Sequence, residues 1–503
     1  MDKRRPNPLL FSVLINAVLF GGIFAFGFPI FNSGDDVYLL YLAGGGFGQP
    51  PTELLHYNYA LHPYLGLVLK GLFTQFPDFN WYASLLYFLH FSFCTVLLRQ
   101  LLKLNKESTA LFIYGLIFFC IEARFLLQPT FTNTALVAAL AGVMLLHDKK
   151  LVLAYVMILF ALCMRVHLLI PVVIIAAPFF SKRSVVHLAG IAALAAIVIF
   201  SQQQYYKQHI PGWGQEEVYR QTVISHYNSL KKPVTNWSEQ PQLVADLIDN
   251  GILFDKELPP ENVRLTVAWQ QPGFSERLYW LIIENKAFVA LMLLMLFYKF
   301  SSIKQHEKNV LKISAALVFA ICAGLLLFRK LPPYVIPGCI LVWLSFAATI
   351  KSESTRGCLF PFIGALLLYW SIKRLDKLNN SNVQQHHQWE CAYKLISSSP
   401  GNLFIVTDDK FPMDYFHVWD TPHQYPVTNL LYKDHFLNNT YQPVYKRFNI
   451  TSPLQFLNNK SVVFTGSNPA IVCKYYELRF GIHSSFSLSK KPQDCIQSYY
   501  LLR

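Results

Sequence analysis

Long apolar runs separated by short basic loops limit what this chain can fold into more than any other feature of its sequence. The first run extends from Pro8 to Pro29 and follows a basic cluster at residues 3–5. About 20 apolar residues cross the hydrocarbon core of a bilayer as a helix, and flanking basic residues stay in the cytoplasm. Because the run is longer than the core of a signal peptide, it predicts an uncleaved first span with a cytoplasmic N-terminus.

Apolar runs continue as far as residue 375. Charged residues make up 14% of the chain and hydrophobic residues 53%, whereas a soluble domain carries about 25% charged residues. The pattern predicts about eleven membrane spans. They lie at residues 8–29, 81–98, 109–121, 131–146, 185–200, 278–298, 310–328, 334–350 and 358–372, with two short helices forming a hairpin within 151–178.

Basic residues set the orientation of these spans. With the hairpin counted as two helices, the predicted inner loops hold about three times as many Lys and Arg as the predicted outer loops, the bias expected of cytoplasmic loops. Counting the hairpin as one helix would invert every later span. The predicted fold is therefore mainly α: a transmembrane domain over residues 1–375, with outer loops 31–80 and 202–277, and an extracytoplasmic domain over 376–503.

The C-terminal part has the composition of a small soluble α/β domain. Leu403–Thr407 and Ser461–Thr465 are short runs rich in β-branched and aromatic residues and are bounded by turn residues, which is typical of strands. Trp389–Ile396 predicts a helix. These elements are too few for a large core, so we expect one small domain at the end of the membrane region.

Three of the nine cysteines, Cys391, Cys473 and Cys495, fall in this C-terminal part. A domain outside the cytoplasm lies in an oxidising compartment, where disulfides persist. Three pairings are open, and we favour Cys473–Cys495.

A net charge of +14 raises the question of a nucleic-acid partner. The basic residues cluster in short loops between apolar runs, where they orient spans and meet anionic lipids. No soluble segment combines a basic stripe with interleaved aromatic residues. The charge therefore indicates membrane lipids as partners and not nucleic acid.

Two adjacent acids, Asp35 and Asp36, follow the first predicted span directly. Other ionisable residues are predicted at the same outer face, and charges near a membrane core tend to face cavities or partners. This set suggests that an anionic ligand binds in the outer part of the membrane. Its further members are His56, His62, Glu122, Arg124, Arg165, His167, Arg329 and Lys330.

Each of these residues also has a plainer interpretation. Asp35 or Asp36 could cap the helix that follows, since Asp is a favoured N-cap residue. Arg329 and Lys330 could extend to the interface as ordinary basic side chains, and Arg165 could pair with Glu122. The residues after the acids, Val37–Leu42, are too few for a span, so we expect surface helices in the first outer loop.

The combination of an early acidic pair, surface helices, many spans and a terminal outer domain resembles GT-C type membrane glycosyltransferases. Local motifs are similar to those of a group of bacterial multi-pass proteins linked to surface polysaccharide. The motifs cover the first 135 residues well and the rest only by layout. They are Asn32–Gly46, Leu69–Phe73, Phe76–Tyr82, Gln128–Ala135 and Leu331–Pro333.

The resemblance implies an enzyme of the bacterial plasma (inner) membrane that uses a polyprenyl-phosphate sugar as donor and a glycan or lipid as acceptor. Asp35 or Asp36 would be the general base that takes the proton of the acceptor hydroxyl. Arg124, Arg165, Arg329 and Lys330 would hold the leaving phosphate, because guanidinium matches phosphate oxygens. Asp35 and Asp36 could instead bind a divalent cation as cofactor.

Two other functions compete with this one. A polysaccharide polymerase or ligase acting on lipid diphosphate-linked glycans would also need outer arginines and a long outer loop, but the early acidic pair favours the transferase. A transporter or flippase would place ionisable residues at the bilayer midplane in related halves of the chain. The charges here gather at one face, and the sequence has no internal repeat.

Overall fold

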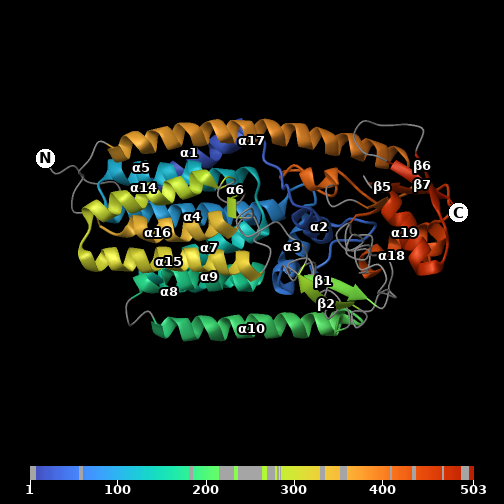
Figure 1. Ribbon diagram of the computed structural model, residues 1–503, viewed down its shortest axis with the longest axis horizontal. Coiled ribbons are helices and arrows are strands. Elements are labelled where there is room, and N and C mark those ends of the chain that lie inside the picture. Colours follow the sequence, from blue (N-terminus) through green and yellow to red (C-terminus); the bar gives the residue numbers. More distant parts are fainter. Residues whose placement is uncertain are drawn as a thin grey trace.

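The computed structural model describes residues 7–55, 61–180, 185–214, 231–235, 263–268, 278–279, 283, 285–328, 335–351, 359–407, 411–432, 438–466, 469–488 and 498–502. The described chain is mainly helical, with a small sheet near its C-terminus. In Figure 1 the apolar helices lie side by side along the long axis of the molecule, and the C-terminal elements gather at one end.

Six helical segments among the described residues are long and apolar enough to cross a membrane. The prediction of a membrane protein is thus supported, although a count of eleven spans is not confirmed. The six segments are α1 (Pro8–Phe26), α4 (Trp81–Leu104), the run Glu107–Leu127, the run Leu151–Phe179, α10 (Val185–His209) and α15 (Gln305–Phe328). Further apolar helices are α7 (Phe131–His147), α14 (Lys286–Ser302) and α16 (Val335–Thr349).

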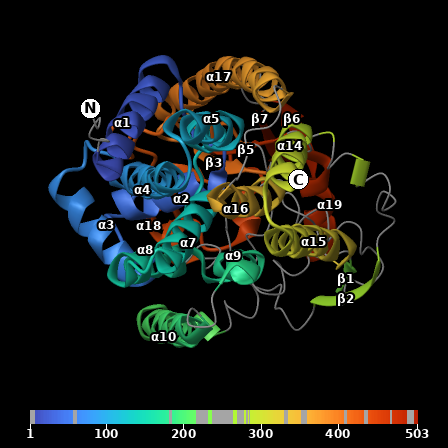
Figure 2. The same ribbon diagram turned by 90° about the vertical axis from the view of Figure 1, so that its left-hand side faces the viewer.

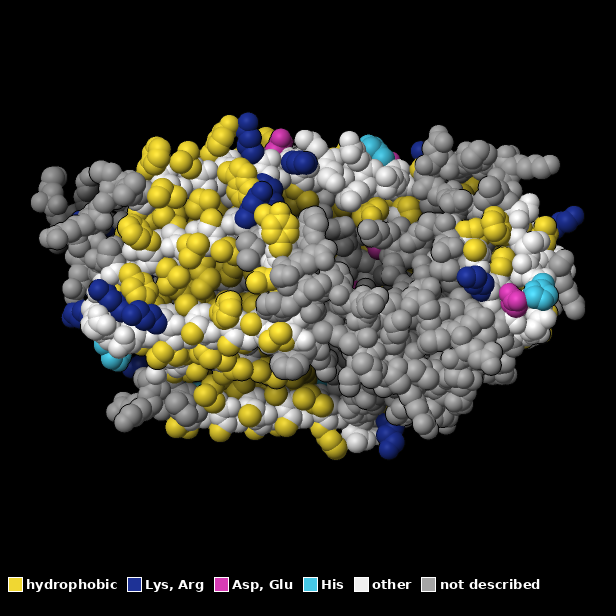
Figure 3. All heavy atoms as spheres, in the orientation of Figure 1, with side chains coloured by type: hydrophobic (Ala, Val, Ile, Leu, Met, Phe, Trp, Pro, Cys, Tyr) yellow, Lys and Arg dark blue, Asp and Glu magenta, His cyan; other side chains and the backbone are white. Residues whose placement is uncertain are grey.

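The helix bundle has an inner and an outer layer. Helix α7 is buried on nearly all sides, as expected of a helix that is apolar all round. Thr130 caps it by accepting a hydrogen bond from the Asn133 backbone N–H. Helices α1 and α10 are mostly exposed to the surroundings, and the end-on view shows α10 set apart from the others (Figure 2). Hydrophobic side chains cover the helical half of the face in Figure 3, as a lipid-facing surface requires.

The run Leu151–Phe179 reverses direction in its middle. It consists of α8 (Leu151–Arg165), a short 3₁₀ turn, and α9 (Leu169–Ala176) followed by a second 3₁₀ turn. Arg165 lies over the ring of Phe131 at the start of α7. Phe179 stacks on Phe346, whose ring also contacts His147 at the end of α7. Both ends of the run therefore lie at one end of α7 and its middle at the other, as the predicted hairpin requires.

Helix α17 (Leu359–Ser398) is 40 residues long and joins the two parts of the molecule. It runs along the bundle and continues into the C-terminal elements (Figure 1). The predicted domain boundary at residues 375 and 376 lies inside this helix, and the predicted helix at Trp389–Ile396 is its last part.

The C-terminal part contains a five-stranded mixed sheet in the order β4-β3-β5-β7-β6. Both predicted strands are present, as β3 (Leu403–Val406) and β5 (Val462–Thr465), which pair in parallel and are fully buried. The other strands are β4 (Leu430–Leu431), β6 (Ser485–Leu488) and β7 (Ser498–Leu502), and helices α18 (Asn438–Arg447) and α19 (Pro469–Phe480) accompany them.

Asp35 and Asp36 do not lie in a surface helix, contrary to the sequence-based expectation. They belong to the first turn of α2 (Gly34–Gly44), which is buried from Asp36 to Ala43. The C-terminal part covers this segment: Phe31 donates its backbone N–H to Phe416 O at 3.0 Å, and Tyr41 donates its hydroxyl to Tyr425 O at 2.8 Å. Contacts between residues almost 400 positions apart thus turn an expected surface helix into a core element.

Glycines end α2 for a steric reason. Gly45 has a φ of 87°, in the left-handed region that L side chains rarely adopt. A Cβ at Gly46 would lie 2.4 Å from Cδ1 of Tyr41. The triplet at residues 44–46 therefore lets the chain turn back closely against α2. The second predicted surface helix exists as α3 (Pro63–Gln75), with a buried stripe and an exposed apolar face.

The long outer loop predicted at 202–277 falls largely outside the described residues. Helix α10 takes up its first residues, and β1 (Lys231–Thr235) pairs antiparallel with β2 (Val263–Ala268).

The predicted Cys473–Cys495 disulfide is wrong. Cys473 is a free thiol on α19, whereas Cys391 on α17 is disulfide-bonded. The sequence left three pairings open, and which cysteine takes part depends on how α17, which carries Cys391, packs within the C-terminal part. Cys495 lies outside the described residues.

Candidate functional site

The first turn of α2 holds the two acids at the junction of the helix bundle and the C-terminal part. Asn32 enters this turn with a φ of 52°, which Asn tolerates better than most residues. Acidic side chains in a first helical turn are stabilised by the exposed N–H groups at that end. Asp35 is half-buried, whereas Asp36 is completely buried.

Two hydrogen bonds anchor the Asp36 carboxylate. Its Oδ1 accepts the hydroxyl of Tyr82 at 2.7 Å and the backbone N–H of Phe131 at 2.7 Å. Its Oδ2 is buried and accepts no hydrogen bond from the described residues. Asp36 therefore joins the starts of three helices, α2, α4 and α7.

Burial raises the pKa of Asp36 to about 7, because removal from water disfavours the charged form. The hydrogen bonds from Tyr82 and Phe131 act in the opposite direction, and the nearby charge of Asp35 adds to the rise. A carboxyl group with a pKa near neutrality exchanges protons at the pH of most cells. Such shifted groups are concentrated at functional sites.

A guanidinium group also contacts Phe131. The Arg165 guanidinium is 5.0 Å from the centre of the Phe131 ring, close enough for a cation–π interaction. Its Nη1 donates to Thr132 Oγ1 at 2.5 Å and its Nε donates to His167 Nε2 at 2.9 Å. Asp36 thus contacts the backbone of Phe131, and Arg165 contacts its ring. His167 belongs to the same cluster through its contact with Arg165.

His62 lies near this cluster but is held by other contacts. Its backbone N–H donates to Cys163 O at 2.6 Å, and its Nε2 lies 2.9 Å from Ser201 Oγ. Its Nδ1 accepts the Tyr64 backbone N–H at the start of α3. Burial lowers the pKa of His62 below its usual value, which favours a neutral ring. Through these contacts His62 holds α3 against α8 and α10.

Glu122 does not pair with Arg165 and does not lie at an outer helix end. It is buried inside the bundle at the end of a π-helical turn, η2 (Phe118–Glu122), and the helix continues through α6 (Ala123–Leu127). Its Oε1 lies 2.5 Å from His90 Nδ1, and His90 Nε2 lies 3.1 Å from Thr134 Oγ1. The sequence pattern did not identify His90, although an imidazole within an apolar run is itself a signal.

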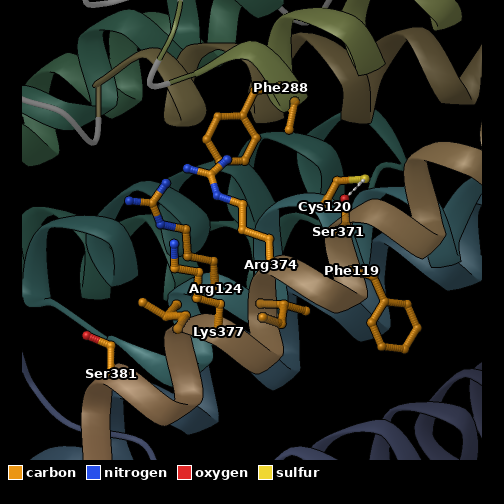
Figure 4. A pocket seen from close by; sticks show the side chains of 11 residues that line it. Phe119, Cys120, Arg124, Phe288, Ser371, Arg374, Lys377 and Ser381 are labelled. Carbon is orange, nitrogen blue, oxygen red and sulfur yellow. Dashed lines mark hydrogen bonds between the residues drawn. The ribbon is translucent and has the colours of Figure 1, made fainter. Parts of the chain in front are cut away.

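Arg124 lines a different cavity, between α6, α14 and α17. Figure 4 shows Arg124 beside Arg374 and Lys377, with the Phe288 ring near both guanidinium groups. None of Asp35, Asp36 and the cluster around Arg165 lines this cavity. The predicted single face of acids and bases is therefore divided among three places: the cluster at Phe131, the buried Glu122 with His90, and the cavity beside Arg124.

The remaining predicted site residues, His56, Arg329 and Lys330, lie outside the described residues. Within the described part of the chain, no three His, Cys, Asp or Glu side chains lie together as a metal site would need. A cation at Asp35 and Asp36 stays a prediction. The contacts that the sequence did not reveal are those of Tyr82 and Phe131 with Asp36, although both residues fall in motifs that carried the resemblance.

Comparisons of the chain with protein-family models, with curated proteins and with solved structures give no match.

Proposed function

We propose that this protein is a membrane glycosyltransferase that moves a sugar from a polyprenyl-phosphate donor to a glycan or lipid acceptor at the outer face of the plasma membrane. One observation carries the proposal: Asp36 and Arg165 both contact Phe131, and Asp35 precedes Asp36 in the first turn of α2. The reaction needs a base for the acceptor hydroxyl and a cation for the leaving phosphate. In this proposal Asp35, the neighbour of Asp36, is the base, and Arg165 is the cation.

The two acids have different roles in this proposal. Asp36 is completely buried and bonded to Tyr82 and Phe131, so it positions the first turn of α2. Asp35 is half-buried beside it and is the carboxylate that an acceptor can reach.

In the proposed reaction the sugar passes from the donor phosphate to the acceptor oxygen. The acceptor oxygen forms a bond to the anomeric carbon of the donor sugar, and its proton passes to Asp35. The bond between that carbon and the phosphate oxygen breaks, and the electron pair leaves with the phosphate. The Arg165 guanidinium, near Phe131 and Thr132, stabilises the charge of the departing polyprenyl phosphate.

Lys and Arg are more numerous in the predicted inner loops than in the predicted outer loops, which supports an outer location for the two acids. The disulfide-bonded Cys391 supports an oxidising compartment for the C-terminal part. The reversal of the chain at Arg165 supports the hairpin, and with it the eleven-span arrangement and a cytoplasmic N-terminus.

The test is the composition of the surface glycan in cells whose only copy of the protein is a chosen variant. Cells without the protein should lose one sugar from the glycan and accumulate the matching polyprenyl-phosphate sugar. Asp35→Asn should reproduce this loss. Asp78→Asn is the matched control, because Asp78 is an exposed acid of the same region that pairs with His423 at 2.7 Å. Unchanged glycan and lipid pools in the deletion strain would refute the proposal.

A further inference from the structure

A histidine and a glutamate meet inside the apolar bundle, in segments long and apolar enough to cross a membrane. His90 on α4 and Glu122 at the end of η2 are both buried. His90 Nδ1 lies 2.5 Å from Glu122 Oε1, and His90 Nε2 lies 3.1 Å from Thr134 Oγ1 on α7. Ionisable side chains within membrane helices are costly, and chains of acids and histidines there mark proton pathways. The pair is therefore a candidate for such a site.

The hydrogen bonds at Thr134 assign one proton to the imidazole of His90. The Thr134 hydroxyl donates its only hydrogen to Thr130 O at 2.8 Å. It can therefore only accept from His90, so the hydrogen of that contact belongs to Nε2. One further proton lies between His90 Nδ1 and Glu122 Oε1, because a single hydrogen fits between two atoms at this separation.

The position of this further proton decides whether the pair is charged. On Nδ1 it gives an imidazolium and a carboxylate, and on Oε1 it gives two neutral groups. Charge separation inside the bundle costs the desolvation of both ions. An ionised Glu122 also needs donors at both of its oxygens, yet its Oε2 is buried and accepts no hydrogen bond from the described residues. The neutral form, with the proton on Glu122, is therefore favoured.

Uncharged polar side chains surround the carboxyl group on its other sides. The Cys94 thiol of α4 interacts with Glu122 and with Tyr114 of α5 (Glu107–Ile117). Tyr114 in turn donates its hydroxyl to Asn16 Oδ1 of α1. None of these three side chains is a cation that would hold Glu122 as a carboxylate. Glu122 also ends the π-helical turn η2, and such turns within α-helices are frequent at functional sites.

Polar groups also continue from the pair toward the candidate site. Thr134 lies near the start of α7 and bonds to Thr130 O, one turn before it. The next residue, Phe131, donates its backbone N–H to Asp36 at 2.7 Å. The pair thus lies close to the end of the bundle that meets the C-terminal part, and a proton has only a short distance to travel between the pair and that end.

We propose that His90 and Glu122 form a proton-binding site inside the membrane bundle. Glu122 holds an exchangeable proton, and His90 Nδ1 accepts it when it moves. In that step the O–H bond of the carboxyl breaks as the N–H bond forms, and the net charge of the pair stays at zero. The inference does not rest on the proposed function, because it uses neither Asp35 nor Arg165.

Infrared spectroscopy of the full-length protein in detergent at neutral pH tests this site. The spectrum of the unchanged protein minus that of Glu122→Gln should contain the carbonyl band of a protonated carboxyl group, and the band should shift in D₂O because the proton exchanges. The glutamine amide can donate to His90 Nδ1 as the protonated acid does, so the fold should be kept. Glu107→Gln is the matched control, since Glu107 is an exposed acid in the first turn of α5. Its difference spectrum should lack the band, because exposed carboxyl groups are ionised at neutral pH.

A second measurement needs no variant and decides the question if Glu122→Gln does not fold. Dicyclohexylcarbodiimide is an apolar reagent that attacks protonated carboxyl groups, so it should modify Glu122 of the unchanged protein at pH 6. Peptide mass spectrometry should show a smaller modified fraction at pH 9, and sodium chloride should protect Glu122 no better than potassium chloride.

Three results would overturn the inference. A difference spectrum without the protonated-carboxyl band, or no modification of Glu122 at pH 6, would leave a fixed ion pair. A band that does not shift in D₂O would mean that the proton does not exchange. Protection by sodium alone would indicate a sodium site. The band should persist in Asp35→Asn, so a failure of the transferase mechanism leaves this test unaffected.

Discussion

Asp36 is the residue whose environment departs most from what its sequence position suggested. An acid directly after a predicted span was expected in an accessible outer loop. It is instead completely buried, with Tyr82 and Phe131 as hydrogen-bond donors. The sequence placed all three residues in distinctive motifs but could not show that these motifs meet, because contact between residues 36, 82 and 131 depends on how helices pack.

The raised pKa of Asp36 predicts a pH-dependent stability. The unfolded protein releases this proton near pH 4, while the folded protein keeps it until about pH 7. Stability should therefore fall as the pH rises from 4 to 7, by an amount on the order of 4 kcal/mol at most, and change no further above that range. Asp36→Asn cannot titrate, so its stability should lack this component.

Thermal unfolding of both proteins in detergent between pH 4.5 and 7.5 checks this prediction. As the pH rises, the unfolding midpoint of Asp36→Asn should increase relative to that of the unchanged protein. Parallel curves for the two proteins would mean that Asp36 does not hold its proton in the folded state.

At the scale of elements, the positions of helices and strands were predicted better than their surroundings. Apolar runs located α1, α4, α7 and most of the other long helices, and β-branched runs located β3 and β5. The burial of α2 was not predicted, because the loops and the helix α18 that cover it come from the far end of the chain. The π-helical turn at Phe118–Glu122 was not predicted either, and it ends at the residue that contacts His90.

The His90–Glu122 contact should stabilise the packing of α4 against η2. His90→Ala should destabilise the protein by about 3–5 kcal/mol, because removal of one partner leaves the other buried without compensation. The double variant His90→Phe with Glu122→Leu should regain much of that loss, since two apolar side chains need no partner. A double-mutant cycle of unfolding in detergent measures the coupling, and strictly additive effects would show that the two side chains do not depend on one another.

At the scale of the whole molecule, the bundle and the C-terminal part are joined by α17 and by contacts around α2. Asn80 donates to Asp420 O at 2.7 Å, and residue Ile30 pairs with His417. The candidate site lies at this junction, so the orientation of the whole chain decides which compartment the site faces. The basic-residue bias predicts the outer side.

Reporter fusions after Lys150, within residues 303–309 and at the C-terminus test that orientation. The first two should report a cytoplasmic position and the last an extracytoplasmic one. Phe131 at the start of α7 lies at the junction with the C-terminal part, and Lys150 follows the other end of α7, so Lys150 and the C-terminal part lie at opposite ends of the bundle. A cytoplasmic C-terminus would place the acids on the wrong side for an outer-face transferase.

The most direct test of the proposed chemistry is the rate of sugar transfer in membranes that contain Asp35→Asn, compared with Asp78→Asn at matched expression. Asp35→Asn should lower the rate by roughly 10²-fold or more, the usual contribution of a general base. It should cost only about 0.3–1 kcal/mol of stability, the value of one charge at a helix N-terminus. Asp78→Asn should transfer at the normal rate. Full activity of Asp35→Asn, alone and together with Asp36→Asn, would contradict the general-base mechanism and favour an arginine-based polymerase.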